Sequence, residues 1–440
     1  MNRARAFALV VVAAAIARAP DGAHADRVQE PPGPLPAFES QLANQLHVIV
    51  APDPTAASIV VHVRYSGGVA DERAPGSTHL VERLMFAGSV HVKDGDFEAK
   101  IVAAGGWASS EVTADHLSTF EEAPPEALEL VLWLEAERMA GLADGITDAG
   151  LARERAAIAA ERRAAYVDHP YGLVARTAQR LLWGTTANGH DPLADGIDHL
   201  TRAEVRDVVK ARIVPRNAEL VIAGRVDAAQ AAALAKHYFE WIPSPPGTVT
   251  GTEPAPPAPL AKHVDATVVD PVPKVMVAFR TDAAFKPATI ALGITARILA
   301  GGRASRLWRT LVDGGLATEV HADVVPQHRG GELRIIATAK PGVDPDRLAA
   351  GIAAAIADLR ARDVTTAELQ RAIATARAEL VGGLENLAVR AATLADWSTE
   401  LGSTQQLAAQ SSMLGVTAAD LRTTAAVWLA DTASATVIGK

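Results

Sequence analysis

Residues Ser58–Gly88 read SIVVHVRYSGGVADERAPGSTHLVERLMFAG, and this stretch decides the fold. Its first part, Ser58–Tyr65, is rich in β-branched residues, which is typical of a strand. A glycine-containing bend follows, and Ser77–Ala87 is expected to be a helix with Ser77 or Thr78 as the N-cap. The stretch therefore predicts a strand, a bend and a helix in direct succession.

The second half of the chain repeats this order, with a strand at Lys274–Arg280 and a helix at Pro287–Ala300. Pro287 suits the first turn of a helix, where no amide donor is needed. Both halves close on an apolar strand followed by glycine. Further strands are expected at Leu46–Ala51, Ala218–Ala223, Glu332–Ala337 and Ala435–Ile438, and further helices at Pro125–Met139, Asp148–Ala165 and Thr365–Leu384. The pattern indicates an α/β or α+β protein that contains a loose duplication.

The N-terminus has the features of an export signal. Two arginines precede the apolar run Ala6–Ala17, which is shorter than a membrane-spanning helix, and Ala23-His24-Ala25 forms an AxA cleavage site. We therefore expect a signal peptide over residues 1–25 and a periplasmic or secreted mature protein. The alternative is an apolar helix that stays in the mature fold.

A second boundary lies near the middle of the chain. Residues 243–260 concentrate Pro, Gly and Thr with almost no charge, which favours an extended linker. The expected division is an N-terminal domain over residues 37–242, this linker, and a C-terminal domain over residues 261–440.

Composition limits the chemistry. The 440 residues are 49% hydrophobic and include no cysteine, so disulfides and thiolate metal sites are excluded. His and carboxylate side chains remain as possible metal ligands. The formal net charge of −9 argues against general nucleic-acid binding.

The candidate chemistry lies on the helix that begins near Ser77. His79 and Arg83 are four residues apart and share a face, with Glu82 beside them. Glu154 and Glu161 are two turns apart on a later helix and could supply a carboxylate from a second element. Taken alone, the first pattern is typical of a solvated or capped helix face, and the second of a salt-bridged surface.

Together these motifs resemble the pitrilysin and insulinase zinc metallopeptidases, a family that includes the mitochondrial processing peptidase. The family signature is the inverted zinc motif HxxEH followed by a Glu-containing helix. The resemblance implies that His79 and Glu161 are metal-ligand positions, that Glu82 is the general-base position, and that Glu154 is a supporting acidic residue. It also implies an α+β fold of two homologous α/β-sandwich domains, each a mostly antiparallel sheet packed with helices, as in the clam-shell halves of these peptidases.

Several positions depart from the family pattern. Arg83 stands where the second His ligand is expected, and a guanidinium has no lone pair for a metal. Its forked shape suits an ion pair with Glu82 and Glu161 instead. The edge strand that pairs with substrate usually carries Asn-Ala, and here it carries Ser109-Ser110.

The second domain departs as well. An Arg and a Tyr that contact substrate in active members align with Leu311 and Thr318. The glycines and the apolar framework look intact, which is the expected appearance of a non-catalytic paralogue.

Three hypotheses about function follow from the resemblance, and they leave enzymatic activity open. The first is an exported, non-catalytic or impaired subunit that pairs with an active zinc peptidase of the same family to form a chamber for peptides or unfolded segments. Zinc would then be absent or weakly bound. The second is an active zinc endopeptidase that uses Glu82 as general base, with a substitute for the missing ligand. The third is a structural or binding protein that keeps the fold.

Overall fold

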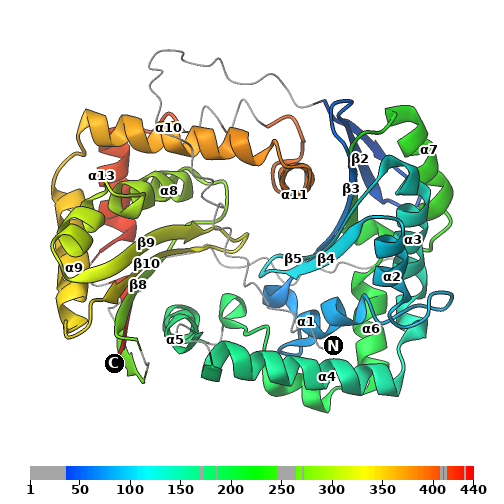
Figure 1. Cartoon of the computed structure of the whole chain (residues 1–440), viewed down its shortest axis with the longest axis horizontal. Coiled ribbons are helices and arrows are strands. Elements are labelled where there is room, and N and C mark those ends of the chain that lie inside the picture. Colours follow the sequence, from blue (N-terminus) through cyan, green and yellow to red (C-terminus); the bar gives the residue numbers. More distant parts are fainter. Residues whose placement is uncertain are drawn as a thin grey trace.

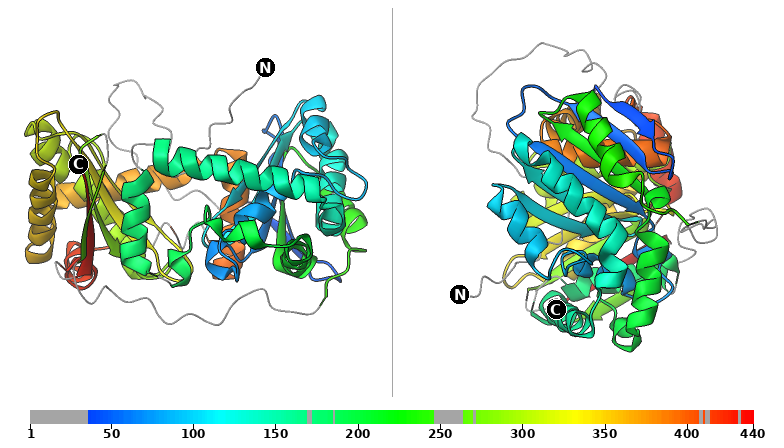
Figure 2. Two further views of the ribbon diagram at one scale, coloured as in Figure 1. Left: turned by 90° about the horizontal axis from the view of Figure 1, so that it is seen from below. Right: turned by 90° about the vertical axis from the view of Figure 1, so that its right-hand side faces the viewer.

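The computed structural model describes residues 36–168, 172–184, 186–245, 264–269, 272–406, 410, 414–430 and 433–440. The expected signal peptide lies outside these residues, as does most of the expected linker. Two sheets lie on opposite sides of the molecule, with one helix, α4, along the bottom of the view in Figure 1 and another, α10, along the top. Figure 2 shows the same separation of the two sheets from below. Within the described part of the chain, no helix is long and apolar enough to cross a membrane.

The first sheet has six strands in the order β1-β2-β6-β3-β5-β4. Only β2 and β6 run parallel, and the other neighbours are antiparallel. The strands are β1 (Phe38–Gln41), β2 (His47–Pro52), β3 (Ile59–Ser66), β4 (Trp107–Val112), β5 (His116–Ala123) and β6 (Ala218–Gly224). The strand β4 forms one edge of the sheet.

The second sheet has five strands in the order β7-β11-β8-β10-β9, with β7 and β11 as the parallel pair. Its strands are β7 (Val264–Val268), β8 (Lys274–Arg280), β9 (Ala317–Val325), β10 (Glu332–Ala339) and β11 (Ser434–Gly439). This order matches that of the first sheet without β1. The predicted fold, two similar and mostly antiparallel sheets packed with helices, is confirmed.

Each sheet has an apolar core between one of its faces and helices from its own half. The helices of the first half are α1 (Ser77–Leu84), α2 (Asp96–Ala103), α3 (Leu128–Gly145), α4 (Asp148–Arg163), α5 (Gly172–Trp183), α6 (Arg202–Arg212) and α7 (Ala228–Phe239). Those of the second half are α8 (Pro287–Ala300), α9 (Asp346–Ala361), α10 (Thr366–Gly383), α11 (Leu387–Leu401) and α13 (Ala418–Trp428).

The opposite face of each sheet is covered by a helix from the other half. From the second half, α11 packs Leu394 and Trp397 against β2, β3 and β6 of the first sheet. From the first half, α5 packs Leu182 and Trp183 against β8 and β11. Each half therefore buries one face of its sheet only through the other half, which couples the two halves.

The sequence pattern predicted the apolar strands β2, β3, β6, β8, β10 and β11 to within two residues, but it did not predict β1, β5, β7 or β9. The edge strand β4 was expected only through the family resemblance. The strands β4, β5 and β9 carry polar residues at alternating positions, so they lack the apolar run that marked the others. In β5 even the core face holds a charged side chain, Glu121, which is fully buried.

Candidate functional site

The helix α1 begins at Ser77, and neither Ser77 nor Thr78 is its N-cap. The N-cap is Gly76, whose φ of 85° favours glycine, and a Cβ there would lie 2.9 Å from a methyl group of Ile197. The carboxylate of Glu72 satisfies the helix start, because it accepts hydrogen bonds from the amides of Gly76 (2.7 Å) and Thr78 (3.1 Å). The predicted N-cap was wrong because this carboxylate, four residues upstream of Gly76, takes that role.

The other end of α1 is held by a buried charge cluster. Arg138 of α3 donates from Nε to the carbonyl oxygen of Met85, the C-cap residue (3.0 Å). A cation suits this place because the C-terminal end of a helix carries partial negative charge. The same guanidinium pairs with Glu121 (3.1 Å) and with Glu135, and all three charged side chains are fully buried. Both ends of α1 are therefore fixed by charged groups.

Helix α4 brings Glu154 and Glu161 against α1. The Nε2 atom of His79 lies 2.8 Å from Oε2 of Glu161. Arg83 donates from Nε to Glu154 (2.8 Å) and from Nη1 to Glu161. The Glu154 and Glu161 side chains are only 9% and 15% exposed, so they form part of the packing between the helices, whereas the Arg153 side chain beside them is 47% exposed.

Glu82 turns toward β4. Its Oε1 accepts a hydrogen bond from the hydroxyl of Ser110, and its Oε2 lies 3.0 Å from Nδ1 of His79. The expected ion pair between Arg83 and Glu82 is therefore replaced by one with Glu154. Ser109, the neighbour of Ser110, is exposed because side chains alternate along the edge strand.

His79 lies between two carboxylates. Burial lowers the pKa of its imidazole, but the hydrogen bonds to Glu161 and Glu82 outweigh burial and raise the pKa to about 9. The ring is therefore positively charged at neutral pH. With Arg83 it gives two cations that face the carboxylates of Glu82, Glu154 and Glu161, so most of the charge is balanced within the cluster.

Two family models match the chain. The model described as "Insulinase (Peptidase family M16)" matches residues 48–183, and the one described as "Peptidase M16 inactive domain" matches residues 199–376. The chain belongs to the M16 insulinase family. The resemblance inferred from the motifs is thereby confirmed.

A curated relative and solved structures are also similar to the chain. The chain is 25% identical over 430 residues to "Zinc protease PqqE" of Helicobacter pylori, covering 92% of this chain and 93% of the relative. A crystal structure of a protease from Helicobacter pylori superimposes with a TM-score of 0.86 at 23% identity, covering 92% of this chain and all of that one. The periplasmic protease PqqL from Escherichia coli superimposes with a TM-score of 0.75 at 16% identity, covering 93% of this chain but 48% of PqqL.

The side chains between α1 and α4 do not fit a catalytic zinc ion. A catalytic zinc site has three protein ligands and a water molecule. Here Arg83, four residues after His79, has no lone pair for a metal and holds Glu161 in an ion pair. Among the residues that the structure describes, no group of three His, Asp or Glu side chains is placed to hold a metal.

The substituted positions of the second half lie away from this cluster. Leu311 is buried in the second core, and the hydroxyl of Thr318 donates to the carbonyl of Thr338 within the second sheet (3.3 Å).

Glu72 and Arg138, which hold the two ends of α1, were not predicted from the sequence. Arg138 had a signal in the sequence, since it lies three residues after Glu135 in a mostly apolar helical stretch. Glu72 had none.

Proposed function

We propose that this chain is an exported, non-catalytic or impaired M16 protein that pairs with a homologous active zinc peptidase. The observation that carries the proposal is the position of Arg83. Its guanidinium joins Glu154 and Glu161 where a metal-binding member would need a His. Because a guanidinium repels a cation and offers no lone pair, the ion pair replaces metal as the link between α1 and α4.

The pairing is supported by the size of a relative. The chain aligns with about half of PqqL, so a second chain of the same fold would supply the remainder of a PqqL-like assembly. In such a pair the partner cleaves peptides, and this chain contributes wall surface to the chamber. Its net negative charge favours basic or extended peptides.

Export is supported by the N-terminal sequence and by PqqL, which is described as periplasmic. The apolar run Ala6–Ala17 and the AxA motif at Ala23-His24-Ala25 are typical of a cleaved signal. The proposed location is the periplasm or the extracellular space.

The test is co-expression with the nearest homologue that has an intact HxxEH motif, followed by peptide cleavage and metal assays. We expect the two chains to co-purify, and we expect cleavage to depend on the partner's motif and to survive Glu82→Gln in this chain. Cleavage by this chain alone that Glu82→Gln abolishes, together with stoichiometric zinc, would contradict the proposal.

A further inference from the structure

The turn between β9 and β10, residues 326–331, reaches from the second half to the first and is called the β9–β10 tip below. Arg329 donates from Nη1 to the carbonyl of Ala70 (2.9 Å) and pairs through Nη2 with Asp71. The Arg329 and Asp71 side chains are only 11% and 9% exposed. Asn188 donates to the carbonyl of Gly330 (2.6 Å). These bonds depend on orientation, so they fix how the tip sits on the first half.

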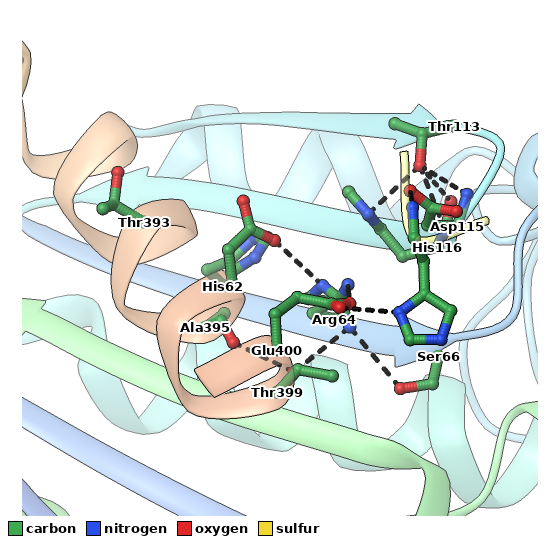
Figure 3. A network of polar contacts seen from close by, with 12 residues as sticks. His62, Arg64, Ser66, Thr113, Asp115, His116, Thr393, Ala395, Thr399 and Glu400 are labelled. Carbon is green, nitrogen blue, oxygen red and sulfur yellow. Dashed lines mark hydrogen bonds and ion pairs between the residues drawn. The ribbon is translucent and has the colours of Figure 1, made fainter. Parts of the chain in front are cut away.

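A second set of contacts holds the β9–β10 tip beside α11. The backbone amide of His328 donates to Asp115 (2.9 Å), and its ring Nδ1 lies 2.8 Å from Glu400 of α11. Glu400 also reaches Arg64 of β3 (3.5 Å), a side chain that is almost completely buried. Figure 3 shows Glu400 and Thr399 reaching Arg64 from α11, with Asp115 close by. The tip is therefore held by groups from both halves.

The segment that receives Arg329 also holds the start of α1. Asp71 accepts a hydrogen bond from the amide of Gly68 (3.2 Å) and pairs with Arg329. The next residue, Glu72, accepts from the amides of Gly76 and Thr78 at the start of α1. Two consecutive carboxylates thus face different ways, one toward the second half and one toward the site helix.

We propose that Arg329 is a positioning residue for α1, through which the second half sets the helix that carries His79, Glu82 and Arg83. Arg329 holds the backbone carbonyl of Ala70 as well as the carboxylate of Asp71, so its loss would release the segment from which Glu72 reaches the start of α1. A partner or peptide that shifts the second sheet would thereby move the site. The proposal goes beyond the proposed function, because it holds whether or not the chain cleaves peptides.

The test is hydrogen–deuterium exchange on the full chain with the variants Arg329→Met and Asp71→Asn. Each variant removes one partner of a buried, charge-assisted pair, so amides in residues 76–84 should exchange about tenfold faster than in the wild type. The matched control is Arg334→Met. Arg334 lies in the same hairpin but pairs with Asp323 (2.6 Å) inside the second sheet, so exchange in α1 should stay unchanged.

Two results would overturn the proposal. Faster exchange confined to residues 326–331, with α1 as in the wild type, would mean that the pair only joins the halves. A uniform increase over all strands would mean that Arg329 acts on global stability and not on α1. Neither result depends on a partner, on zinc or on peptide cleavage, so failure here is distinct from failure of the proposed function.

Discussion

The helices α1 and α8 occupy equivalent places in the two halves, but α1 buries charged side chains and α8 does not. Each follows the central strand of its sheet, β3 or β8, and each packs on its core. In α1 the buried side chains include His79 and Glu82, whereas those of α8 are apolar or threonine. The difference shows that the fold accepts an uncharged helix at this place.

The fold therefore does not by itself require the charged side chains that are buried in the first half. Removing a charged group from water costs free energy unless partners and hydrogen bonds offset it. In α1 the offset comes from α4, which supplies Glu154 and Glu161, and from Ser110 of β4. These contacts offset the cost of burying charged side chains between α1, α4 and β4.

The largest expected effect comes from the buried cluster below α1. Arg138→Met should lower the free energy of unfolding by about 3–5 kcal/mol, because Glu121 and Glu135 would stay buried without their cation. Urea denaturation measures this. In α8, Ile298→Val removes one methylene from the core and should cost about 1 kcal/mol. Equal losses would show that the two helices are held in the same way, and the comparison would fail.

The next effect concerns the ion pairs that Arg83 forms between α1 and α4. Arg83→Met should cost about 2–3 kcal/mol, because it removes the cation that two mostly buried carboxylates share and leaves each with one cationic partner. The control is Arg153→Met, which removes a half-exposed partner of Glu154 and should cost at most about 1 kcal/mol. If thermal and urea unfolding gave the same loss for both variants, Arg83 would be an ordinary surface residue.

The smallest effect concerns pH and the charged face of the first sheet. Burial raises the pKa of Asp115 and of Asp396 to about 6, against an ordinary value near 3.8. Between these pH values the folded state binds more protons than the unfolded state, so stability should rise as pH falls from 7 to 4. After solvent screening at the partly exposed Asp396, the two groups should contribute about 1 kcal/mol together.

The measurement is the free energy of unfolding from pH 4 to pH 7 for the wild type and for Asp115→Asn/Asp396→Asn. The difference in the free energy of unfolding between the two proteins should shrink by about 1 kcal/mol as the pH falls from 7 to 4. A constant difference would show that neither carboxyl titrates differently in the folded state.

Sequence predicted the central strands and the helix pair of the site, because apolar runs and helical spacing are local signals. It placed His79, Arg83, Glu154 and Glu161 on facing helices through the family resemblance. It did not predict that Arg83 would form an ion pair with Glu154 and not with Glu82, since helix spacing does not fix which carboxylate a long side chain reaches.

The sequence also did not predict that α5 covers the second sheet and α11 the first. Both helices are amphipathic, but nothing in their periodicity tells which sheet they cover. The edge strand β4 was expected only through the family resemblance, because its residues, WASSEV, lack an apolar run. Such features depend on contacts between residues that are far apart in the chain.

The central claim is that Arg83 takes the place of a zinc ligand. The most direct test is metal analysis of the wild type and of Arg83→His, purified side by side after exposure to zinc. We predict less than about 0.1 zinc per wild-type chain and about one per Arg83→His chain, because the substitution restores the three-ligand set. Stoichiometric zinc in the wild type, unchanged by Arg83→His, would contradict the account.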